Sequence, residues 1–303
     1  MPREPEPSLN ERQFFTQALR QQLRLDARPF DQFRPITLAF AERYGVVDLS
    51  LGGTRIHAHV SAEVTQPYPD RPYEGLFTIV TELSPMTHAH LEPGRNSPLE
   101  MLVSRLLEKT IRRSGALDPE SLCLLAGQTC WSIRVDVHVL SVEGNLIDAA
   151  SIAVIAALAH FKRPETNTVG GEVTLYTLAE REPVPLSLLH WPLCITFSFY
   201  KDHSEGASGE DTVLLDANEL EEHMREGSMT IGMNKHGEIC QLVKLGGAPV
   251  DAASLLKCVN LASMKVKEVS DIIAKQLQED AKKRDKGGVM AGLLSSENAR
   301  IPS

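Results

Sequence analysis

The stretch VEGNLIDAASIAVIAAL, residues 142–158, places a glycine turn directly before an apolar helix. The first N–H groups of a helix have no partner within the helix and lie at its positive dipole end, so such a turn can hold a phosphate. Oxyanion sites use arginine and other strong donors, yet this turn carries Leu146, Ile147 and Asp148. Asp148 would repel an anion while stabilising the helix N-terminus. The turn could therefore be a phosphate site, a former phosphate site, or only a turn that packs the helix.

Four basic side chains gather on one face of the helix that we expect at 98–113, within about 100° of arc. They are Arg105, Lys109, Arg112 and Arg113. The opposite face carries an apolar stripe that we expect to be buried, formed by Leu99, Leu102, Val103, Leu106, Leu107 and Ile111. Glu108 can pair with Arg112 on an ordinary solvated face. Because one glutamate cannot neutralise four cations, the pattern favours a local basic patch.

Carboxylates and histidines at other positions have a simpler structural interpretation. Asp216, Glu221 and Glu222 could perform acid–base catalysis, but neighbouring carboxylates on a short acidic helix most often form a solvated face, and we expect that here. His57 and His59 are two residues apart in a strand pattern and share one face of it. We expect them to form a structural pair and not to bind a metal.

Length and composition indicate a folded chain of two domains. The chain has 303 residues, of which 42% are hydrophobic and 23% charged, and domains usually run to roughly 100–200 residues. The net charge of −9 excludes a protein that coats nucleic acid non-specifically, so any contact with nucleic acid needs a local basic patch. No apolar run approaches the roughly 20 residues of a membrane span, and the first residues lack a signal-peptide pattern.

The cysteines indicate reduced thiols. Their number is odd, at five, and none are spaced as C-x-x-C. This usage is typical of the cytosol or nucleus and lacks the spacing of a zinc site. We therefore expect no metal and no cofactor.

Periodicity predicts two successive β-rich units, each ending in a helix, which indicates an α+β fold (α/β mixed) with mixed sheets packed against helices. We expect a helix at 8–24, a hairpin at 46–64, a strand at 73–86, the helix at 98–113, strands within 123–142, a helix at 148–160, strands at 193–200 and 212–216, a helix at 218–225, a hairpin at 228–244 and a helix at 251–284. The boundaries that follow are an N-terminal helix at 1–30, domain 1 at 31–165, a linker with a short strand at 166–187, domain 2 at 188–284 and a tail at 285–303.

Six segments of the sequence together resemble the RNase PH family. They are RLDARPFDQFRPI, RPYEGLF, SRLLEKTIRRSGALD, VDVHVLSVEGNLIDAASIAVIAAL, EREPVPLSLLHWPL and NKHGEICQLVKLGGAPV. The resemblance runs from about residue 8 to residue 284, although Ala27 stands where most members carry glycine. It is strongest to the non-catalytic ring subunits of the eukaryotic RNA exosome, of the polymyositis/scleroderma-autoantigen type.

This resemblance implies a two-domain RNase PH-type fold and a place in a six-membered ring of three heterodimers whose pore admits single-stranded RNA. The implied partners are RNase PH-like ring subunits, one of them an obligate heterodimer partner, together with exosome cap proteins and associated 3′-to-5′ exoribonucleases. No membrane partner is implied. The implied role is RNA processing and decay, including rRNA processing and mRNA turnover, in the nucleus, nucleolus and cytoplasm.

The resemblance also implies that this chain is not itself an enzyme. Phosphorolytic members read glycine-glycine-threonine-arginine at the turn, where the chain has Gly144, Asn145, Leu146 and Ile147. The family's catalytic carboxylate aligns at or beside Gly227-Ser228, and neither residue can be a general acid at neutral pH. The alternative is a phosphorolytic 3′-to-5′ exoribonuclease that shares an active site with its heterodimer partner. A third possibility is a free-standing scaffold of the same fold.

The matching helix of RNase PH-like rings points basic side chains toward the RNA path. The resemblance therefore implies RNA contacts for Arg105, Lys109, Arg112 and Arg113. Arg95 and His90, in the loop before that helix, would extend the path.

Overall fold

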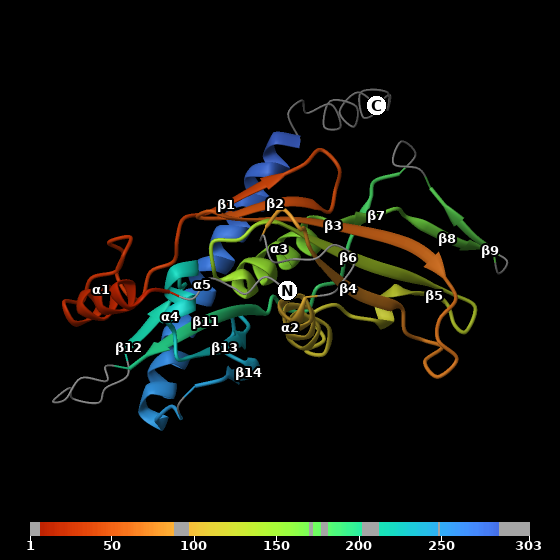
Figure 1. The fold of residues 1–303 in the computed structure, drawn as a ribbon. Coiled ribbons are helices and arrows are strands. Elements are labelled where there is room, and N and C mark those ends of the chain that lie inside the picture. Colours follow the sequence, from red (N-terminus) through yellow and green to blue (C-terminus); the bar gives the residue numbers. More distant parts are fainter. Residues whose placement is uncertain are drawn as a thin grey trace.

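The computed structural model describes residues 7–87, 97–169, 172–176, 181–201, 212–247 and 249–284 (Figure 1). Two large β-sheets with helices between and beside them, and two small two-stranded sheets, make up this part of the chain, which confirms the α+β prediction. None of the helices in the described ranges is long and apolar enough to cross a membrane. The expected tail at 285–303 lies outside the described residues, as does the segment 202–211 between two expected strands.

The first sheet is built from strands β1 (Ile36–Phe40), β2 (Val46–Leu51), β3 (Thr54–Thr65), β4 (Leu76–Leu83), β5 (Cys123–Leu125) and β6 (Thr129–Ser141). The strand order is β1-β2-β3-β6-β4, and β5 pairs with β6. All pairs are antiparallel except β4 with β6. Burial alternates along β2, β3 and β6, so one face of this sheet is apolar and must be covered. Sequence reasoning had missed β1.

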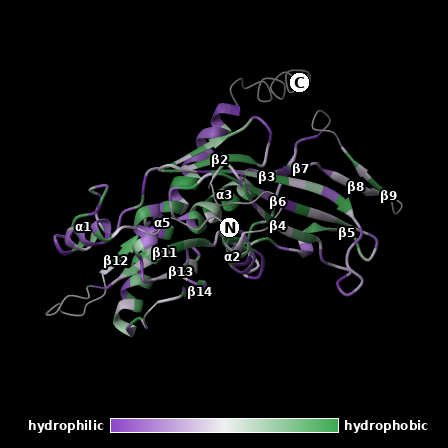
Figure 2. Cartoon of the chain, in the orientation of Figure 1, coloured by the Kyte–Doolittle hydropathy of each residue, from purple (hydrophilic) through white to green (hydrophobic). Residues whose placement is uncertain are grey.

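Helix α3 (Leu146–His160) covers the apolar face of the first sheet and also packs on the second. The second sheet is antiparallel, in the order β12 (Thr212–Leu215), β11 (Leu193–Tyr200), β13 (Gly227–Met233) and β14 (Ile239–Leu245). Since α3 contacts β2, β3 and β11, it lies between the two sheets (Figure 1). Hydrophobic residues gather in α3 and the strands beside it (Figure 2). One apolar cluster therefore includes residues of both sheets and of the helix between them.

Two helices follow strands of the second half. Helix α4 (Glu219–Met224) begins with a capping box between Asn218 and Glu221, as its acidic first turn favours. Helix α5 (Ala252–Arg284) packs along β11, β13 and α3 and reaches β1. The expected helices at 218–225 and 251–284 are thus confirmed to within two residues at each end.

Helix α1 (Leu9–Arg20) is shorter than the expected helix at 8–24. Ser8 and Glu11 form the capping box that their spacing predicts. Phe15 is buried against Tyr200 of β11, with the two rings 5.1 Å apart. Leu23 lies outside the helix, because the chain turns at Gln22 with a positive φ and leaves Leu23 54% exposed.

The helix expected at 98–113 is confirmed, but its last part is a π-helix and not an α-helix. Helix α2 (Pro98–Leu107) is capped by Ser97, and a π-helical turn, η1 (Glu108–Arg112), continues it. Most of the expected stripe is buried or half-buried. Leu99 is the exception at 37% exposed, because it lies in the first turn of α2.

The segment expected as a linker holds more strand than its sequence indicates. A short 3-10 turn, η2 (Glu120–Leu122), precedes β5. Strand β7 (Lys162–Arg163) pairs with β10 (Val184–Pro185), and β8 (Thr166–Val169) pairs with β9 (Glu172–Leu175). The boundaries at 165, 187 and 284 remain a prediction.

Candidate functional site

The turn before α3 is closed from outside by the second half of the chain. Gly144 has a φ of +84°, and a Cβ there would lie 2.6 Å from the carbonyl oxygen of Ala217. Asn145 follows in the left-handed conformation and starts the helix. The Gly144 carbonyl accepts hydrogen bonds from Thr54 Oγ1 at 2.8 Å and Arg34 Nη2 at 3.1 Å. The turn is thus a junction between the first sheet and the loop before α4.

Asn145 joins two buried carboxylates. Its Nδ2 donates to Asp216 Oδ1 at 2.7 Å and to Asp148 Oδ2 at 3.0 Å. Its side chain is therefore engaged in the junction, and Asn145 is only 2% exposed. Ile147 packs against the apolar core.

Asp148 does more than stabilise the start of α3. It is fully buried and accepts hydrogen bonds from Thr196 N at 2.8 Å and Thr196 Oγ1 at 2.7 Å. Burial raises its pKa to about 7, although the hydrogen bonds from Thr196 and Asn145 act in the opposite direction. Asp148 thus ties α3 to the central strand β11 of the second sheet.

The solvated carboxylate face expected at Asp216, Glu221 and Glu222 is wrong for two of the three residues. Asp216 and Glu221 are both fully buried, and only Glu222 lies near the surface, where it pairs with Arg225 at 2.9 Å. Both buried carboxylates bind arginines that lie about 190 residues earlier in the chain. Residue spacing along the sequence could not predict these pairs.

Asp216 is held by the N-terminal segment. Arg34 Nε and Nη2 donate to its two carboxylate oxygens at 3.0 and 2.9 Å, and the backbone N–H of Arg34 adds a bond at 2.8 Å. Arg28 Nη1 donates at 2.9 Å. Burial alone would raise the pKa of Asp216, but the bonds and charge of Arg34 outweigh it and hold that pKa below its usual value.

Glu221 is held in the same way by Arg24. Arg24 Nη2 and Nε donate to the two carboxylate oxygens at 2.6 and 3.2 Å, and both side chains are fully buried. Arg24 also donates to the carbonyl oxygens of Leu215 and Asp216. Residues 24–34, which we call the N-terminal strap, therefore fasten the start of the chain to the loop between β12 and α4.

Gly227 and Ser228 begin strand β13 and are buried. A Cβ at Gly227 would meet the backbone oxygen of Gly246 at 3.0 Å. Ser228 is 4% exposed and pairs across the sheet with Ser198 of β11.

The four basic side chains of α2 and η1 are all exposed, as expected. The last two, Arg112 and Arg113, end or follow a π turn, so the arc expected from an α-helix does not apply to them. Glu108 does pair with Arg112, at 3.2 Å on the surface. Among the described residues, Arg105, Lys109 and Arg113 have no acidic partner within ion-pair distance. Arg95 and His90 lie outside the described ranges.

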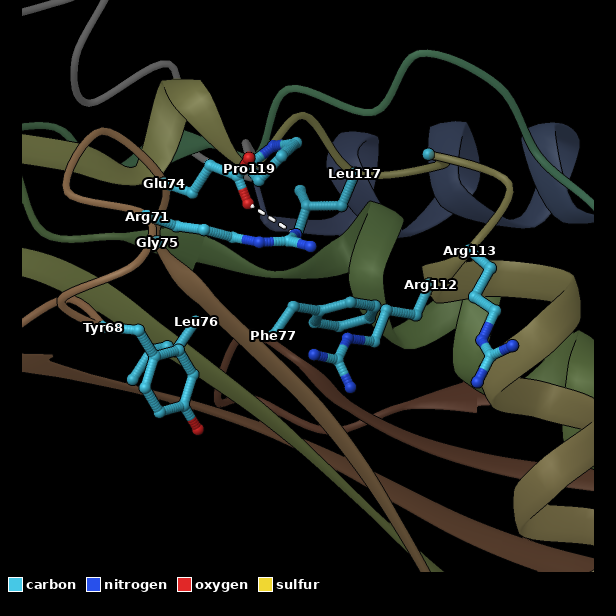
Figure 3. Close-up of a pocket in the computed structure, with 11 residues that line it drawn as sticks. Tyr68, Arg71, Glu74, Gly75, Leu76, Phe77, Arg112, Arg113, Leu117 and Pro119 are labelled. Carbon is cyan, nitrogen blue, oxygen red and sulfur yellow. Dashed lines mark hydrogen bonds and ion pairs between the residues drawn. The ribbon is translucent and has the colours of Figure 1, made fainter.

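Arg112 and Arg113 instead reach a pocket of about 270 Å³ (Figure 3). Its other walls come from the segment after η1, which supplies Leu117 and Pro119, from the start of β4, and from the segment between β3 and β4, which supplies Tyr68 and Arg71. Sequence reasoning missed this side of the pocket. The signal present was the segment PYPDRPYEG at 67–75, in which proline turns alternate with aromatic and arginine side chains.

His57 contacts a carboxylate. Its Nδ1 lies 2.6 Å from Asp48 Oδ1, and its ring centre is 6.3 Å from that of His138 on β6. Burial and the nearby Arg43 lower the pKa of His59. In the ranges that the structure describes, no group of three or more His, Cys, Asp or Glu side chains could hold a metal ion.

Comparisons with known proteins agree on one family. The model of the 3′ exoribonuclease family, domain 1, matches residues 32–164, and that of domain 2 matches residues 190–265. The chain is 45% identical to "Exosome complex component RRP45" of Saccharomyces cerevisiae, covering 99% of both chains. It is 46% identical to the protein of that name in Schizosaccharomyces pombe, covering 94% of this chain and 96% of the other.

Longer relatives and solved structures extend the comparison. The chain is 42% identical to the Homo sapiens protein named RRP45, of which it covers 65%. The structure titled "archaeoglobus fulgidus exosome with RNA bound to the active site" matches with a TM-score of 0.71 and 26% identity, over 86% of this chain and 97% of the other. A second structure, "Archaeal exosome core", matches with a TM-score of 0.69 and 25% identity, over 88% of this chain and 96% of the other.

Proposed function

The chain belongs to the 3′ exoribonuclease family of RNase PH type, and from this premise we propose that it is a non-catalytic, RNA-channelling subunit of an exosome ring. The relatives named as exosome complex components are 42–46% identical to it over almost its whole length, which supports the same place in such an assembly. The 3′-to-5′ processing and decay of RNA would then be carried out by an associated nuclease.

One observation carries the non-catalytic part of the proposal. At the turn before α3, the position aligned with the family's phosphate-binding arginine is Ile147, whose side chain packs against the core. The neighbouring Asn145 donates to Asp216 and Asp148, and the loop at 217–219 closes on Gly144. A phosphate at this turn would meet two buried carboxylates and no cationic side chain of the turn itself.

The second feature that supports the proposal is the exposed basic surface of α2 and η1. Arg105, Lys109, Arg112 and Arg113 reach solvent, and among the described residues only Arg112 of these four has an acidic partner within ion-pair distance. In a chain of net charge −9 they form a local basic surface that can attract an anion. A threading RNA strand presents one phosphate per nucleotide to such a surface without any need for base recognition. Arg95 would extend this path.

The partners we propose are RNase PH-like ring subunits, one of them an obligate heterodimer partner, with exosome cap proteins and associated 3′-to-5′ exoribonucleases. Obligate interfaces usually bury more than about 2,000 Å² and resemble a core cut in half. The chain expressed alone should therefore be poorly soluble, and co-expression with its ring neighbour should give a soluble heterodimer. The places of action we propose are the nucleus, the nucleolus and the cytoplasm.

The test is native mass spectrometry of the complex purified through a tag on this chain, followed by an RNA-shortening assay. We expect RNase PH-like neighbours at equal stoichiometry and no phosphate-dependent release of nucleoside diphosphate from the chain with its heterodimer partner alone. Release of nucleoside diphosphate would instead support the alternative, a phosphorolytic exoribonuclease with a shared active site. A stable monodisperse monomer without such neighbours would overturn the proposed function.

A further inference from the structure

The pocket beside η1 is lined by guanidinium groups, an aromatic ring, apolar side chains and one carboxylate, that of Glu74. Arg71, Arg112 and Arg113 supply three guanidinium groups, and Tyr68 supplies an aromatic ring that is 60% exposed. The apolar part of the lining comes from Leu76, Phe77, Leu117 and Pro119. Figure 3 shows Arg71 and Arg112 extending toward the same space, with Tyr68 on one side and the Phe77 ring beside the Arg112 side chain.

The wall that carries Tyr68 and Arg71 is held rigidly. Two successive β-turns form it, closed by hydrogen bonds from Arg71 N to Tyr68 O at 3.0 Å and from Glu74 N to Arg71 O at 3.3 Å. Each turn has proline at its second position, where the fixed φ of proline favours the turn. Tyr68, Arg71 and Glu74 therefore occupy the ends of the turns, where the closing hydrogen bonds fix their backbone.

Two backbone hydrogen bonds anchor these turns to the rest of the first half. Gly127 N donates to Pro72 O, and Gly75 N donates to Pro119 O, both at 2.9 Å. Gly75 lies so close to its neighbours that a Cβ would be 2.3 Å from Leu122 Cβ. The ring of Tyr68 is thus exposed on a backbone that is already ordered, which lowers the entropy cost of binding.

The charges of the pocket are available to an anion. Arg71 pairs with Glu74 at 3.0 Å and Arg112 with Glu108 at 3.2 Å, but both pairs are exposed and so contribute little. Arg113 has no acidic partner within ion-pair distance among the described residues. An incoming phosphate can replace these weak contacts with charge-assisted, bidentate hydrogen bonds.

The volume limits the size of the occupant. Small-ligand sites usually measure about 300–1,000 Å³. The pocket, at about 270 Å³, has room for one nucleotide-sized group. A carboxylate from a protein neighbour would use the arginines but would leave the exposed aromatic ring and the apolar lining unused. A nucleotide uses all three, because its base is flat and aromatic and its phosphate is anionic.

We propose that this pocket is a nucleotide subsite that holds one nucleotide of a single-stranded RNA. The base stacks on Tyr68, and the phosphate binds the guanidinium groups of Arg71, Arg112 and Arg113. The inference rests on the proposed function for the presence of RNA, and it adds a contact to the base that the exposed arginines and lysine of α2 and η1 alone do not supply. Because stacking tolerates every base, the subsite grips the strand without reading its sequence.

The test uses the complex purified through a tag on this chain and a short single-stranded RNA, with affinity measured at several salt concentrations. Tyr68→Ala should lower affinity about fivefold, the lower end for one stacked base, with little change in salt dependence. Tyr68→Phe should keep the affinity. Tyr73→Ala is the matched control, since Tyr73 is 67% exposed on the same segment but does not line the pocket.

Arg71→Gln tests the phosphate contact separately. It should lower the slope of log affinity against log salt by about 0.7, the value for one phosphate of a single strand. The control is Arg134→Gln, because Arg134 is similarly exposed and also paired with an acid, at 2.7 Å, but lies away from the pocket. A set of RNAs, each with one abasic position, locates the stacked base. At one of these positions, the loss of the base should remove the effect of Tyr68→Ala on affinity.

Each negative result has a distinct meaning. Equal effects of Tyr68→Ala and Tyr73→Ala, or no effect of either, would overturn the nucleotide subsite while the composition of the complex still tests the proposed function. Loss of a ring neighbour in Tyr68→Ala or Arg71→Gln with unchanged RNA affinity would show that a protein side chain fills the pocket, and would also overturn it. A complex without RNase PH-like neighbours would refute the proposed function whatever these variants do.

Discussion

The N-terminal strap and the pocket beside η1 both concentrate arginines, but they use them in opposite ways. In the strap, Arg24 and Arg34 are 4% and 6% exposed and meet the fully buried Glu221 and Asp216. In the pocket, Arg71 and Arg112 are 70% and 50% exposed in their side chains and make only surface pairs. A buried charge must be matched inside the fold, whereas an exposed one can exchange its partner. The arginines that stabilise the fold are therefore different from the arginines that can bind an external anion.

The strap should give the largest effect on stability. Asp216→Ala leaves Arg34 and Arg28 without their buried carboxylate, so the free energy of unfolding should fall by about 3–5 kcal/mol. Chemical denaturation of the co-expressed heterodimer measures it. Glu222→Ala is the control, because its half-exposed pair with Arg225 is worth at most about 1 kcal/mol. Equal losses in the two variants would contradict the contrast between buried and exposed pairs.

The dependence of stability on pH tests the role of the buried carboxylates. The pKa of Asp148 is raised from 3.8 to about 7 in the folded chain, so the folded state binds this proton more tightly than the unfolded state does. The free energy of unfolding should therefore fall as pH rises from about 4 to about 7, with an upper limit of about 4 kcal/mol.

Asp148→Asn should flatten this dependence. The pKa of Asp216 is lowered, so its contribution is present above its ordinary pKa of 3.8 and is lost as pH falls below that value. The two groups thus act in separate pH windows. A profile between pH 4 and 7 that is the same in the wild type and in Asp148→Asn would show that Asp148 does not titrate there.

The exposed side should govern RNA binding and leave folding unchanged. Changing Arg105, Arg112 and Arg113 together to glutamate should lower the slope of log affinity against log salt by about 2 in the assembled complex, if each contacts one phosphate. Stability should change by about 0.5 kcal/mol or less per site, since all three side chains are exposed. Unchanged affinity and slope would mean that these residues are only a solvated helix face.

The smallest effect is expected for Glu108→Gln. The pair with Arg112 on η1 is exposed, so its loss should lower stability by only about 0.3–0.5 kcal/mol. Freed from Glu108, Arg112 should bind RNA phosphates slightly better, and affinity should rise by less than about threefold at low salt. A fall in RNA affinity would show that Glu108 orients Arg112 toward the strand.

Local patterns predicted most of the elements, because alternation, glycine turns and capping residues are properties of short segments. The capping box at Ser8, the hairpin about Gly52-Gly53 and the helix after Gly144 follow from neighbouring residues alone. The π turn at 108–112 has no such local signal, and the edge strand β1 is short and only half-buried. The π turn and β1 form because of contacts with distant parts of the fold, which local patterns do not show.

The errors in the candidate site have one physical cause. Whether Asp216 is a solvated carboxylate or a buried ion partner depends on Arg34, which lies 182 positions away. Likewise, the pocket needs Tyr68 and Arg112 from different elements, and no spacing rule connects them. Residue types showed correctly which side chains carry charge, but the fold decides which charges are already matched.

The strap also has a consequence for the order of events during synthesis. Arg24 emerges from the ribosome 197 residues before Glu221, and Arg34 emerges 182 residues before Asp216. At roughly 5–20 residues per second, this delay lasts about 10–40 s. During that time the arginines of the strap have no native partner, and the turn before α3 lacks the loop that closes on it. The strap can therefore dock only after β12 and α4 exist, so it completes the fold late.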